Sequence, residues 1–477
     1  PVCYPVESLL NGLSFDGKGR LISFQLDNTL DAGAYMGNSK DYCGAMANKF
    51  FRCYKYPHMK YTGRAVITNT PVSGAFRGWT SPELAICLEH NLNMAARRLN
   101  VDPLELRLIN AAESGDMDIR LRESLGPIRL KECIELGRNR FGWDKKREED
   151  KSFNRENRRY RRGTAIACGG HLNGYYPRVN DFCGVEMRMT ETGNVLVNAS
   201  LHDHGCGTVQ AFRMIVAEVL SLSPDMVQIG EGDTAITPFD YGCYSSRSTY
   251  VIGKAAMDCA DLIAGRLKRA VFRLEGVPEE QLLIENGAVQ WKVGKKSWLF
   301  SSVVQASHSR LQEEIFAAKQ YVNTTNPGVT GVHFAHVEVD LGIGDVEILD
   351  YLAVHDIGKA INPEMCRAQV QGAVAMGAGA ALKEEVTVGA DGRVLGSLRK
   401  YHLLNMPELP EIRVEFIEDG GTEGPFGCKS IGEVCHVPPT AAIIGAVNEA
   451  LQSDLCQIPL NQDRICAWLE ERSKEKL

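Results

Sequence analysis

Two pairs of short alternating segments predict β-hairpins in a chain that also encodes long helices. Residues 185–189 and 195–197 place apolar side chains at every second position around a Thr-Glu-Thr-Gly turn, and residues 333–340 and 345–354 flank a Gly-Ile-Gly turn. Strict alternation is typical of strands, and turns that contain glycine favour hairpins. Strands that are mixed with helices through connections of unequal length predict an α+β fold.

The helices are predicted from apolar residues at helical spacing. Residues 80–98 place Leu84, Leu88 and Leu92 on one face. The preceding Thr-Ser-Pro-Glu predicts a capping box between Thr80 and Glu83. Residues 207–222 and 439–451 predict two further helices, and residues 19–26 predict a strand. No repeat of 20–50 residues is visible, so a solenoid is excluded.

The amino-acid composition excludes several classes of protein. Hydrophobic residues make up 44% of the 477 and charged residues 24%, which excludes a disordered or fibrous chain. The net charge of 53 − 60 = −7 gives no reason to expect a nucleic-acid partner. No run of about 18 apolar residues predicts a membrane span. Since the chain begins at Pro1, with no signal-like segment, we expect a fragment or a processed subunit.

The cysteines point to a reducing compartment. The chain has 15 of them from Cys3 to Cys466, and no two stand at CxxC spacing. This spacing excludes a zinc ribbon and an iron–sulfur cluster bound by this chain. We therefore expect buried free thiols and a cytoplasmic protein.

A strongly charged segment divides the sequence. In residues 144–162, 14 of 19 side chains are charged, so little of the segment can be buried. We expect a solvated linker there, between one domain at 1–143 and another at 163–477. A basic docking patch is the alternative.

Five segments combine glycine, hydroxyl or amide groups in the way that binding loops do. Residues 74–79 (GAFRGW) and 202–208 (HDHGCGT) each lead into a predicted helix, whose N-terminus favours anions. The alternatives are a plain turn at the first, and a turn or metal ligation by Asp203 and its flanking histidines at the second. Residues 244–253 (YSSRSTYVIG) suit a phosphate or a pterin-like ring, or form an ordinary polar loop.

The remaining two segments carry an amide and a carboxylate. In residues 367–377, Gln369 or Gln371 could donate to a ligand or could satisfy nearby backbone. In residues 429–435 (KSIGEVC), Glu433 follows Gly432 among apolar neighbours. Burial should raise the pKa of this carboxyl group, which suits a general base. A surface glutamate in a turn is the alternative.

Taken in order along the chain, these segments resemble the C-terminal portion of the molybdenum-binding part of the xanthine dehydrogenase and aldehyde oxidoreductase family. The matching motifs are AFRG at 75–78, GCG at 205–207, the hydroxyl-rich loop at 245–249 with Gly253, NP at 362–363 followed by QVQG at 369–372, and SIGE at 430–433. The resemblance implies two elongated mixed α/β domains with a molybdopterin cofactor between them. It also implies a molybdopterin-dependent oxidoreductase.

The resemblance also assigns roles to single positions. It makes Glu433 the catalytic base, and places Trp79, Tyr175 and Tyr176 against a planar substrate. The resemblance implies that no protein side chain ligates molybdenum directly. The positions that match the cofactor-binding loops are Ala75, Phe76, Arg77, Gly205, Cys206, Gly207, Thr208, Ser245, Ser246, Ser248, Thr249, Gln369, Ser430 and Gly432.

The chain departs from the family at three places. Cys206 stands where many relatives have glutamine, and Ala45 stands where xanthine-oxidising relatives have a purine-binding arginine. The family's earlier half has no counterpart here. Because this arginine is missing, we do not expect xanthine itself as the substrate. Trp79, Tyr175 and Tyr176 favour a planar aromatic N-heterocycle, such as a purine or a nicotinate-like ring, as the substrate.

The expected function is thus that of a molybdenum hydroxylase subunit, which adds a water-derived oxygen to an electron-poor ring carbon. The cofactor would be molybdopterin with molybdenum, in its plain or its cytosine dinucleotide form. Expected partners are a chain that supplies the N-terminal half of the site, a [2Fe–2S] subunit and, in some forms, an FAD subunit. Alternatives are an aldehyde oxidoreductase, a reductive dehydroxylase of aromatic thioesters, and a metal-free scaffold or cofactor-insertion protein.

Overall fold

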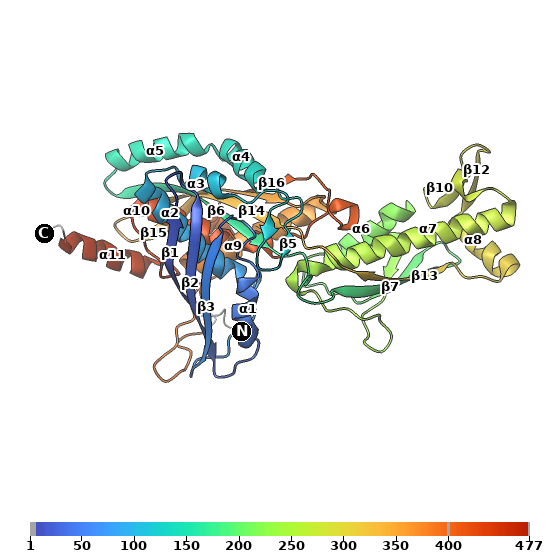
Figure 1. The fold of residues 1–477 in the computed structure, drawn as a ribbon, viewed down its shortest axis with the longest axis horizontal. Helices are drawn as coiled ribbons and strands as arrows, with labels where there is room; N and C mark the ends of the chain where they lie inside the picture. Colours follow the sequence, from blue (N-terminus) through green and yellow to red (C-terminus); the bar gives the residue numbers. More distant parts are fainter. Residues whose placement is uncertain (1–5, 398–400, 476–477) are drawn as a thin grey trace.

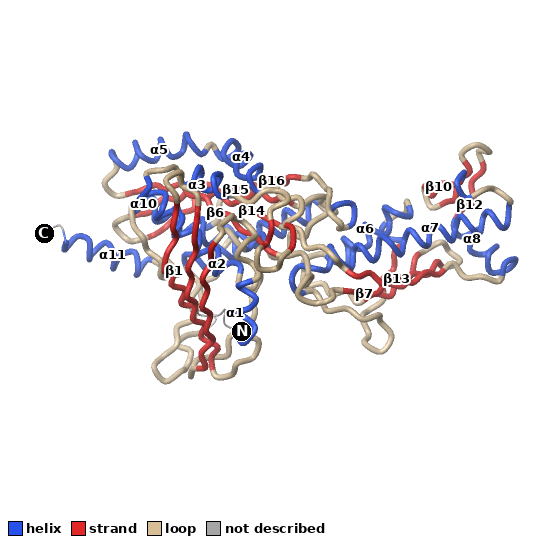
Figure 2. The backbone as a smooth tube through the Cα atoms, in the orientation of Figure 1, coloured by secondary structure: helices blue, strands red, loops and turns tan. Residues whose placement is uncertain are grey.

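The protein forms two lobes that lie end to end, as seen in a computed structural model that describes residues 6–397 and 401–475 (Figure 1). The larger lobe contains both ends of the described chain, and the smaller lobe contains residues from about 182 to 322. Helices and strands are mixed in both lobes (Figure 2). The predicted α+β class of two elongated mixed domains is therefore confirmed.

The larger lobe is built on a four-stranded sheet in the order β16-β15-β14-β6. A three-stranded sheet in the order β1-β2-β3 extends from it (Figure 1). The strands of these two sheets and of the short pair β4–β5 are β1 (Val6–Phe15), β2 (Leu21–Gly33), β3 (His58–Ile67), β4 (Met117–Asp118), β5 (Glu123–Ser124), β6 (Tyr160–His171), β14 (Val329–Asp340), β15 (Asp345–Asp356) and β16 (Ile412–Ile417).

Helices cover both faces of the four-stranded sheet. The helix α10 packs on β6 and β14, and α4 packs on β14 and β15. The α-helices of this lobe are α1 (Ser39–Ala47), α2 (Ser81–Leu99), α3 (Pro103–Asn110), α4 (Leu130–Phe141), α5 (Trp143–Glu156), α9 (Pro363–Leu382), α10 (Pro439–Leu451) and α11 (Gln462–Glu475).

The smaller lobe packs the long helix α7 against a sheet in the order β13-β7-β8-β9. The two predicted hairpins are confirmed, because β7 pairs antiparallel with β8 and β14 pairs antiparallel with β15. The elements of the smaller lobe are β7 (Phe182–Met189), β8 (Val195–Ala199), α6 (Thr208–Leu220), β9 (Val227–Ile229), α7 (Gly253–Glu275), β10 (Leu282–Glu285), β11 (Ala288–Trp291), β12 (Lys296–Leu299), α8 (Phe300–Ala306) and β13 (Phe316–Val322).

The charged segment 144–162 is not the open linker that its composition predicts. It forms most of α5 and the first residues of β6, and α5 packs along β6. Trp143 is 1% exposed, and the buried Asp150 accepts a hydrogen bond from Thr164 Oγ1 at 2.6 Å. The hydrophobic core that contains Trp143 also contains Phe334, so it extends across the expected domain boundary. Of the side chains of α5, only those of Trp143 and Asp150 are buried, so the charged segment forms a helix without offering the apolar periodicity that would have predicted one.

The predicted capping box at the start of α2 does not form. Thr80 adopts a left-handed conformation with φ 78° and makes no side-chain cap. Glu83 turns inward instead, and burial raises the pKa of its carboxyl group.

Two further observations concern the cysteines and the lengths of the helices. The described cysteines are all free thiols, most of them buried, while Cys3 lies outside the described residues. Within 6–397 and 401–475, none of the helices is both long enough and apolar enough to cross a bilayer.

Candidate functional site

The carboxylate of Glu433 lies at the junction of the two lobes. It accepts hydrogen bonds from Gly78 N at 3.2 Å, from His171 Nε2 at 2.9 Å and from Ser246 Oγ at 2.7 Å. Gly78 precedes α2 and His171 ends β6, while Ser246 belongs to the loop that leads into α7. Three segments distant in sequence therefore meet at one side chain, which is 22% exposed.

The approach of Gly78 to Glu433 depends on its being glycine. Its φ is +86°, a region that L side chains rarely adopt. A Cβ atom at this position would lie 3.1 Å from Pro82. The sequence predicts an anion near the start of this helix, and the anion found there is the protein's own Glu433.

The pKa of Glu433 corrects the sequence-based expectation. Burial pushes the pKa of this carboxyl group upward, as predicted. The attraction of His171, the hydrogen bond from it, the charge of Lys49 and the hydrogen bond from Ser246 together outweigh burial. They hold the pKa of Glu433 well below its usual range, so the carboxylate is ionised at neutral pH.

Arg77 connects three of the predicted segments. Its Nε donates to Gly432 O at 2.6 Å, and its Nη2 donates to Gln369 Oε1 at 2.8 Å. Gln369 Nε2 in turn donates to Gly205 O at 3.4 Å. Arg77 thus contacts two other predicted positions directly and a third, Gly205, through Gln369. Ala75 and Phe76 lie beside them on the exposed side of the loop.

The hydroxyl groups of residues 244–253 make different contacts. Ser246 reaches Glu433, whereas Ser245 Oγ donates to Gly174 O at 2.9 Å. Ser430 Oγ donates to Ser246 O, which ties the two loops together. Ser248 and Thr249 lie further on, in a short π-helical stretch (Ser248–Ile252), and Ser248 is buried.

Arg247 does not offer its guanidinium to a phosphate. It is fully buried, and its Nε donates to Asp181 Oδ1 at 2.8 Å. Its Nη1 donates to Asp240. The same Asp181 accepts from Tyr175 N at 2.8 Å, so the ion pair positions the loop that carries Tyr175.

The 202–208 loop already holds an anion of its own. Asp203 Oδ1 accepts from Gly205 N at 2.9 Å and from Gly207 N at 3.1 Å. The predicted backbone cradle is therefore occupied by this carboxylate. Cys206 Sγ lies 2.9 Å from Thr208 Oγ1. The alternative of a metal site is not supported, since no group of three or more His, Cys, Asp or Glu in the described part of the chain could hold a metal ion.

The three aromatic residues that were expected at a substrate differ in their surroundings. Tyr175 is half-buried, and its ring lies 6.0 Å from that of Tyr241. Tyr176 faces another way, since its hydroxyl donates to Glu123 Oε1 at 3.1 Å. Trp79 lies 6.4 Å from Tyr42, edge on, and its Nε1 is buried without a partner among the described residues.

Two side chains that lie at the candidate site are not predicted from the sequence. His171 is 1% exposed and contacts Glu433, and the buried Lys49 donates to Trp79 O and, at 3.5 Å, to Gly78 O. A histidine that follows Gly169-Gly170 at the end of a strand was the available signal for His171. Nothing in the sequence around Lys49 marks it, because it contacts the site only through the tertiary fold.

Comparison with known proteins gives two family matches along the chain. Sequence models of the molybdopterin cofactor-binding domain match residues 12–111 and 136–410. The second match covers more than half of the chain. Both models therefore place this chain in one family.

Individual relatives and solved structures agree. The chain is 29% identical to the xanthine dehydrogenase molybdenum-binding subunit of Escherichia coli O157:H7, over 97% of this chain and 63% of that protein. It is 25% identical to the gamma subunit of the 6-hydroxypseudooxynicotine dehydrogenase complex of Paenarthrobacter nicotinovorans, over 92% and 56%. The crystal structure of quinoline 2-oxidoreductase from Pseudomonas putida 86 superimposes with a TM-score of 0.89 at 25% identity, over 98% and 62%. The chain thus spans about three-fifths of the length of these relatives.

Proposed function

This chain belongs to the molybdopterin cofactor-binding family of xanthine dehydrogenase-type molybdenum-binding subunits, and on that basis we propose that it is part of a molybdenum hydroxylase acting on an aromatic N-heterocycle. One observation carries the proposal: an ionised, half-enclosed carboxylate, Glu433, lies where the loops expected to hold the cofactor converge.

The residues around Glu433 suit a pterin cofactor. The amide of Gln369, the guanidinium of Arg77 and the hydroxyl of Ser246 are the kinds of group that hydrogen-bond the polar edge of a pterin ring. The Cβ position of Gly205 has no atom within 4 Å, so a ligand can approach the backbone there. When bound, molybdopterin supplies a metal centre that accepts the two electrons of the oxidation, while water provides the oxygen.

Glu433 would act as the general base. Its Oε2 already accepts two hydrogen bonds, from His171 and Ser246, whereas Oε1 accepts only the 3.2 Å bond from Gly78 N. Oε1 therefore has a lone pair free to take up the proton of the attacking oxygen. Because Glu433 is ionised at neutral pH, no prior deprotonation is needed.

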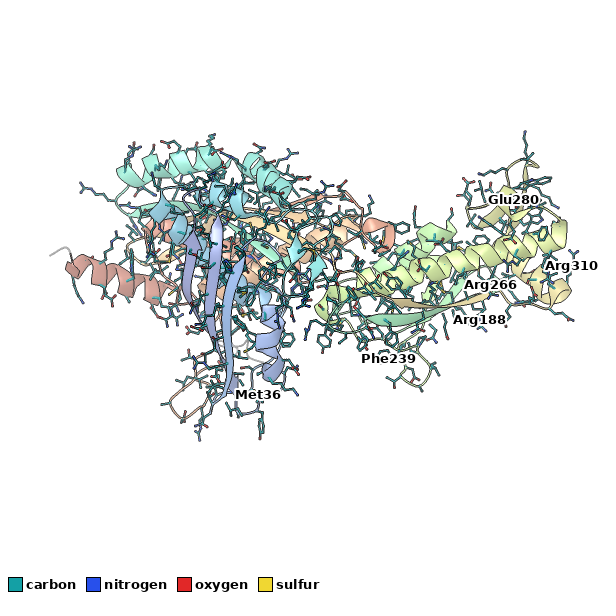
Figure 3. The ribbon with its side chains drawn as sticks, in the orientation of Figure 1. Met36, Arg188, Phe239, Arg266, Glu280 and Arg310 are labelled. Atoms are coloured by element: carbon teal, nitrogen blue, oxygen red, sulfur yellow. The ribbon has the colours of Figure 1, made fainter. Side chains whose placement is uncertain are left out.

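Tyr175 and the aromatic residues beyond it support a planar substrate. The rings of Tyr175 and Tyr241 lie 6.0 Å apart, and those of Tyr241 and Phe182 lie 5.6 Å apart. The row continues to Phe239, which is 56% exposed on the smaller lobe (Figure 3). Flat ring faces favour flat ligands. Two of the relatives are named for quinoline and xanthine, both N-heteroaromatic rings.

The partners belong to the same proposal. We expect the electrons to pass to a [2Fe–2S] subunit, with or without an FAD subunit, and a further segment or chain to complete the metal site. The location would be cytoplasmic. The names of relatives describe subunits and complexes, which supports the expectation of partner subunits.

The test is elemental analysis and isotope labelling of the complex that co-purifies with this chain. We expect one molybdenum per chain, and product that carries oxygen-18 when the reaction runs in labelled water. The absence of molybdenum would indicate the metal-free scaffold. Loss of a phenolic oxygen from the substrate would indicate a reductive dehydroxylase, and oxidation of aldehydes alone would indicate an aldehyde oxidoreductase.

A further inference from the structure

His171 connects two residues of the larger lobe on either side of its ring. Its Nε2 lies 2.9 Å from Glu433 Oε2, and its Nδ1 lies 2.9 Å from Ser81 Oγ. The imidazole is 1% exposed, so water does not compete for either nitrogen. Ser81 begins α2 and its backbone N donates to Gly78 O at 3.0 Å, so the hydroxyl is held by the same turn that presents Gly78 to Glu433.

The bond directions follow from the chemistry of the three groups. An ionised carboxylate can only accept, so His171 Nε2 must carry the proton of that hydrogen bond. In a neutral imidazole the other nitrogen, Nδ1, is then an acceptor, and the Ser81 hydroxyl donates to it. Burial lowers the pKa of His171, which favours the neutral ring. Ser81 therefore selects the tautomer that presents an N–H to Glu433.

Other charged and titratable groups also face Glu433. Lys49 comes from the segment after α1, Tyr175 and Cys243 come from the loops of the smaller lobe, and Cys435 follows Glu433 itself. Arg77 contacts the adjacent Gly432. Among these groups, His171 makes the direct contact with Oε2, together with the uncharged Ser246.

We infer that His171, held in one tautomer by Ser81, is a positioning residue that occupies Oε2 of Glu433 and so directs proton uptake to Oε1. This inference rests on the proposed function for its catalytic meaning. The hydrogen-bonded chain from Ser81 to Glu433 is a property of the protein alone, and it can be measured without turnover.

The experiment is an infrared titration of the full chain labelled with carbon-13 glutamate. Subtracting the spectra of Glu433→Gln isolates the carboxyl band of Glu433. We expect His171→Leu to move the midpoint of this titration upward by about one pH unit or more, since the attraction of the protonated ring and its hydrogen bond, which both favour the ionised form, are lost. His171→Gln retains an N–H donor and should restore part of the shift.

The pair Ser81→Ala and Ser81→Thr isolates the tautomer, which exists only while the ring is neutral. At neutral pH, nitrogen-15 NMR of labelled histidine reports which ring nitrogen carries the proton, and His171→Gln identifies the signal of His171. Alanine removes the donor to Nδ1, so we expect the tautomer with its proton on Nε2 to lose population. Threonine retains the hydroxyl and should give the wild-type spectrum. If His171→Leu does not fold, this pair decides. The inference is overturned if alanine and threonine give the same tautomer populations, or if His171→Leu titrates like the wild type.

Activity separates this inference from the proposed function. In the active complex, the acidic limb of kcat/KM should move to higher pH in His171→Leu, by the same amount as the infrared midpoint, with KM unchanged. Full activity of Glu433→Gln would contradict the proposed function but would not affect the infrared result. If Glu433→Gln is inactive and the infrared midpoint of Glu433 in His171→Leu equals that of the wild type, only the role of His171 is contradicted.

Discussion

Ser246 Oγ donates a hydrogen bond to Glu433 Oε2 over 2.7 Å, and this bond joins the smaller lobe to the larger one at the site. The two residues are 187 positions apart in sequence. A rearrangement of the two lobes would therefore change the environment of the proposed base directly. This dependence makes Glu433 the first residue to test.

Replacing Glu433 by glutamine should abolish most of the activity. Glutamine has nearly the same shape but cannot take up a proton, and general-base catalysis typically contributes about 10²–10⁴-fold. We expect kcat to fall by that factor while the molybdenum content, measured by mass spectrometry, stays at the wild-type value. Turnover close to that of the wild type would remove Glu433 from the role of base.

Replacing Lys49 by methionine should change how stability depends on pH. Burial lowers the pKa of Lys49 to about 8, whereas an unfolded lysine keeps a pKa of about 10.4. Between these values the unfolded chain binds more protons than the native one, so stability rises with pH across this window. We expect the midpoint of urea denaturation to rise between pH 8 and 10 in the wild type, and to rise less in Lys49→Met. Parallel profiles of the two proteins would contradict the assignment.

Replacing Arg77 by lysine should weaken cofactor retention. Lysine keeps the charge, but it cannot donate to Gly432 and Gln369 at once, as the planar guanidinium does. We expect a lower ratio of molybdopterin to protein and a lower Tm. The matched control is Arg393→Lys, whose side chain is 86% exposed and should leave both values unchanged. Equal cofactor content in the two variants would show that the contacts of Arg77 do not hold the site.

Replacing Tyr175 by alanine should raise KM for a planar aromatic substrate. An aromatic contact contributes about 0.5–1.5 kcal/mol beyond burial, which corresponds to roughly a 2- to 13-fold change in affinity. Tyr175→Phe retains the ring and serves as the control. If KM stays the same in Tyr175→Ala, the ring does not contact the substrate.

Replacing Trp79 by alanine should affect both binding and stability. The edge contact with Tyr42 and the buried Nε1 place part of the indole in the protein core. Large-to-small changes of this kind typically cost about 3–5 kcal/mol when the ring is fully buried, and we expect less here because Trp79 is half-buried. We therefore expect a lower Tm together with a higher KM. A lower Tm with an unchanged KM would assign Trp79 to packing alone.

The sequence predicts several of the elements near the site, but not β6, α7 or α9. The hairpins β7–β8 and β14–β15 were predicted from alternation, and α10 was predicted with its observed bounds from Pro439 to Leu451. These features depend on neighbours within a few residues, which a sequence displays directly. Helix α5 was missed because its charged residues outnumber the few that pack on β6.

The amino-acid sequence by itself determined the five loops, their order and the identity of the carboxylate, because turn-forming glycines and helix starts are encoded locally. Only the tertiary structure decided the state of that carboxylate. The donors to Glu433 come from Gly78, His171 and Ser246, which lie 355, 262 and 187 positions away from it in sequence. Burial alone would have raised the pKa of Glu433, and it is the attraction of His171, the hydrogen bonds from His171 and Ser246, and the charge of Lys49 that lower it.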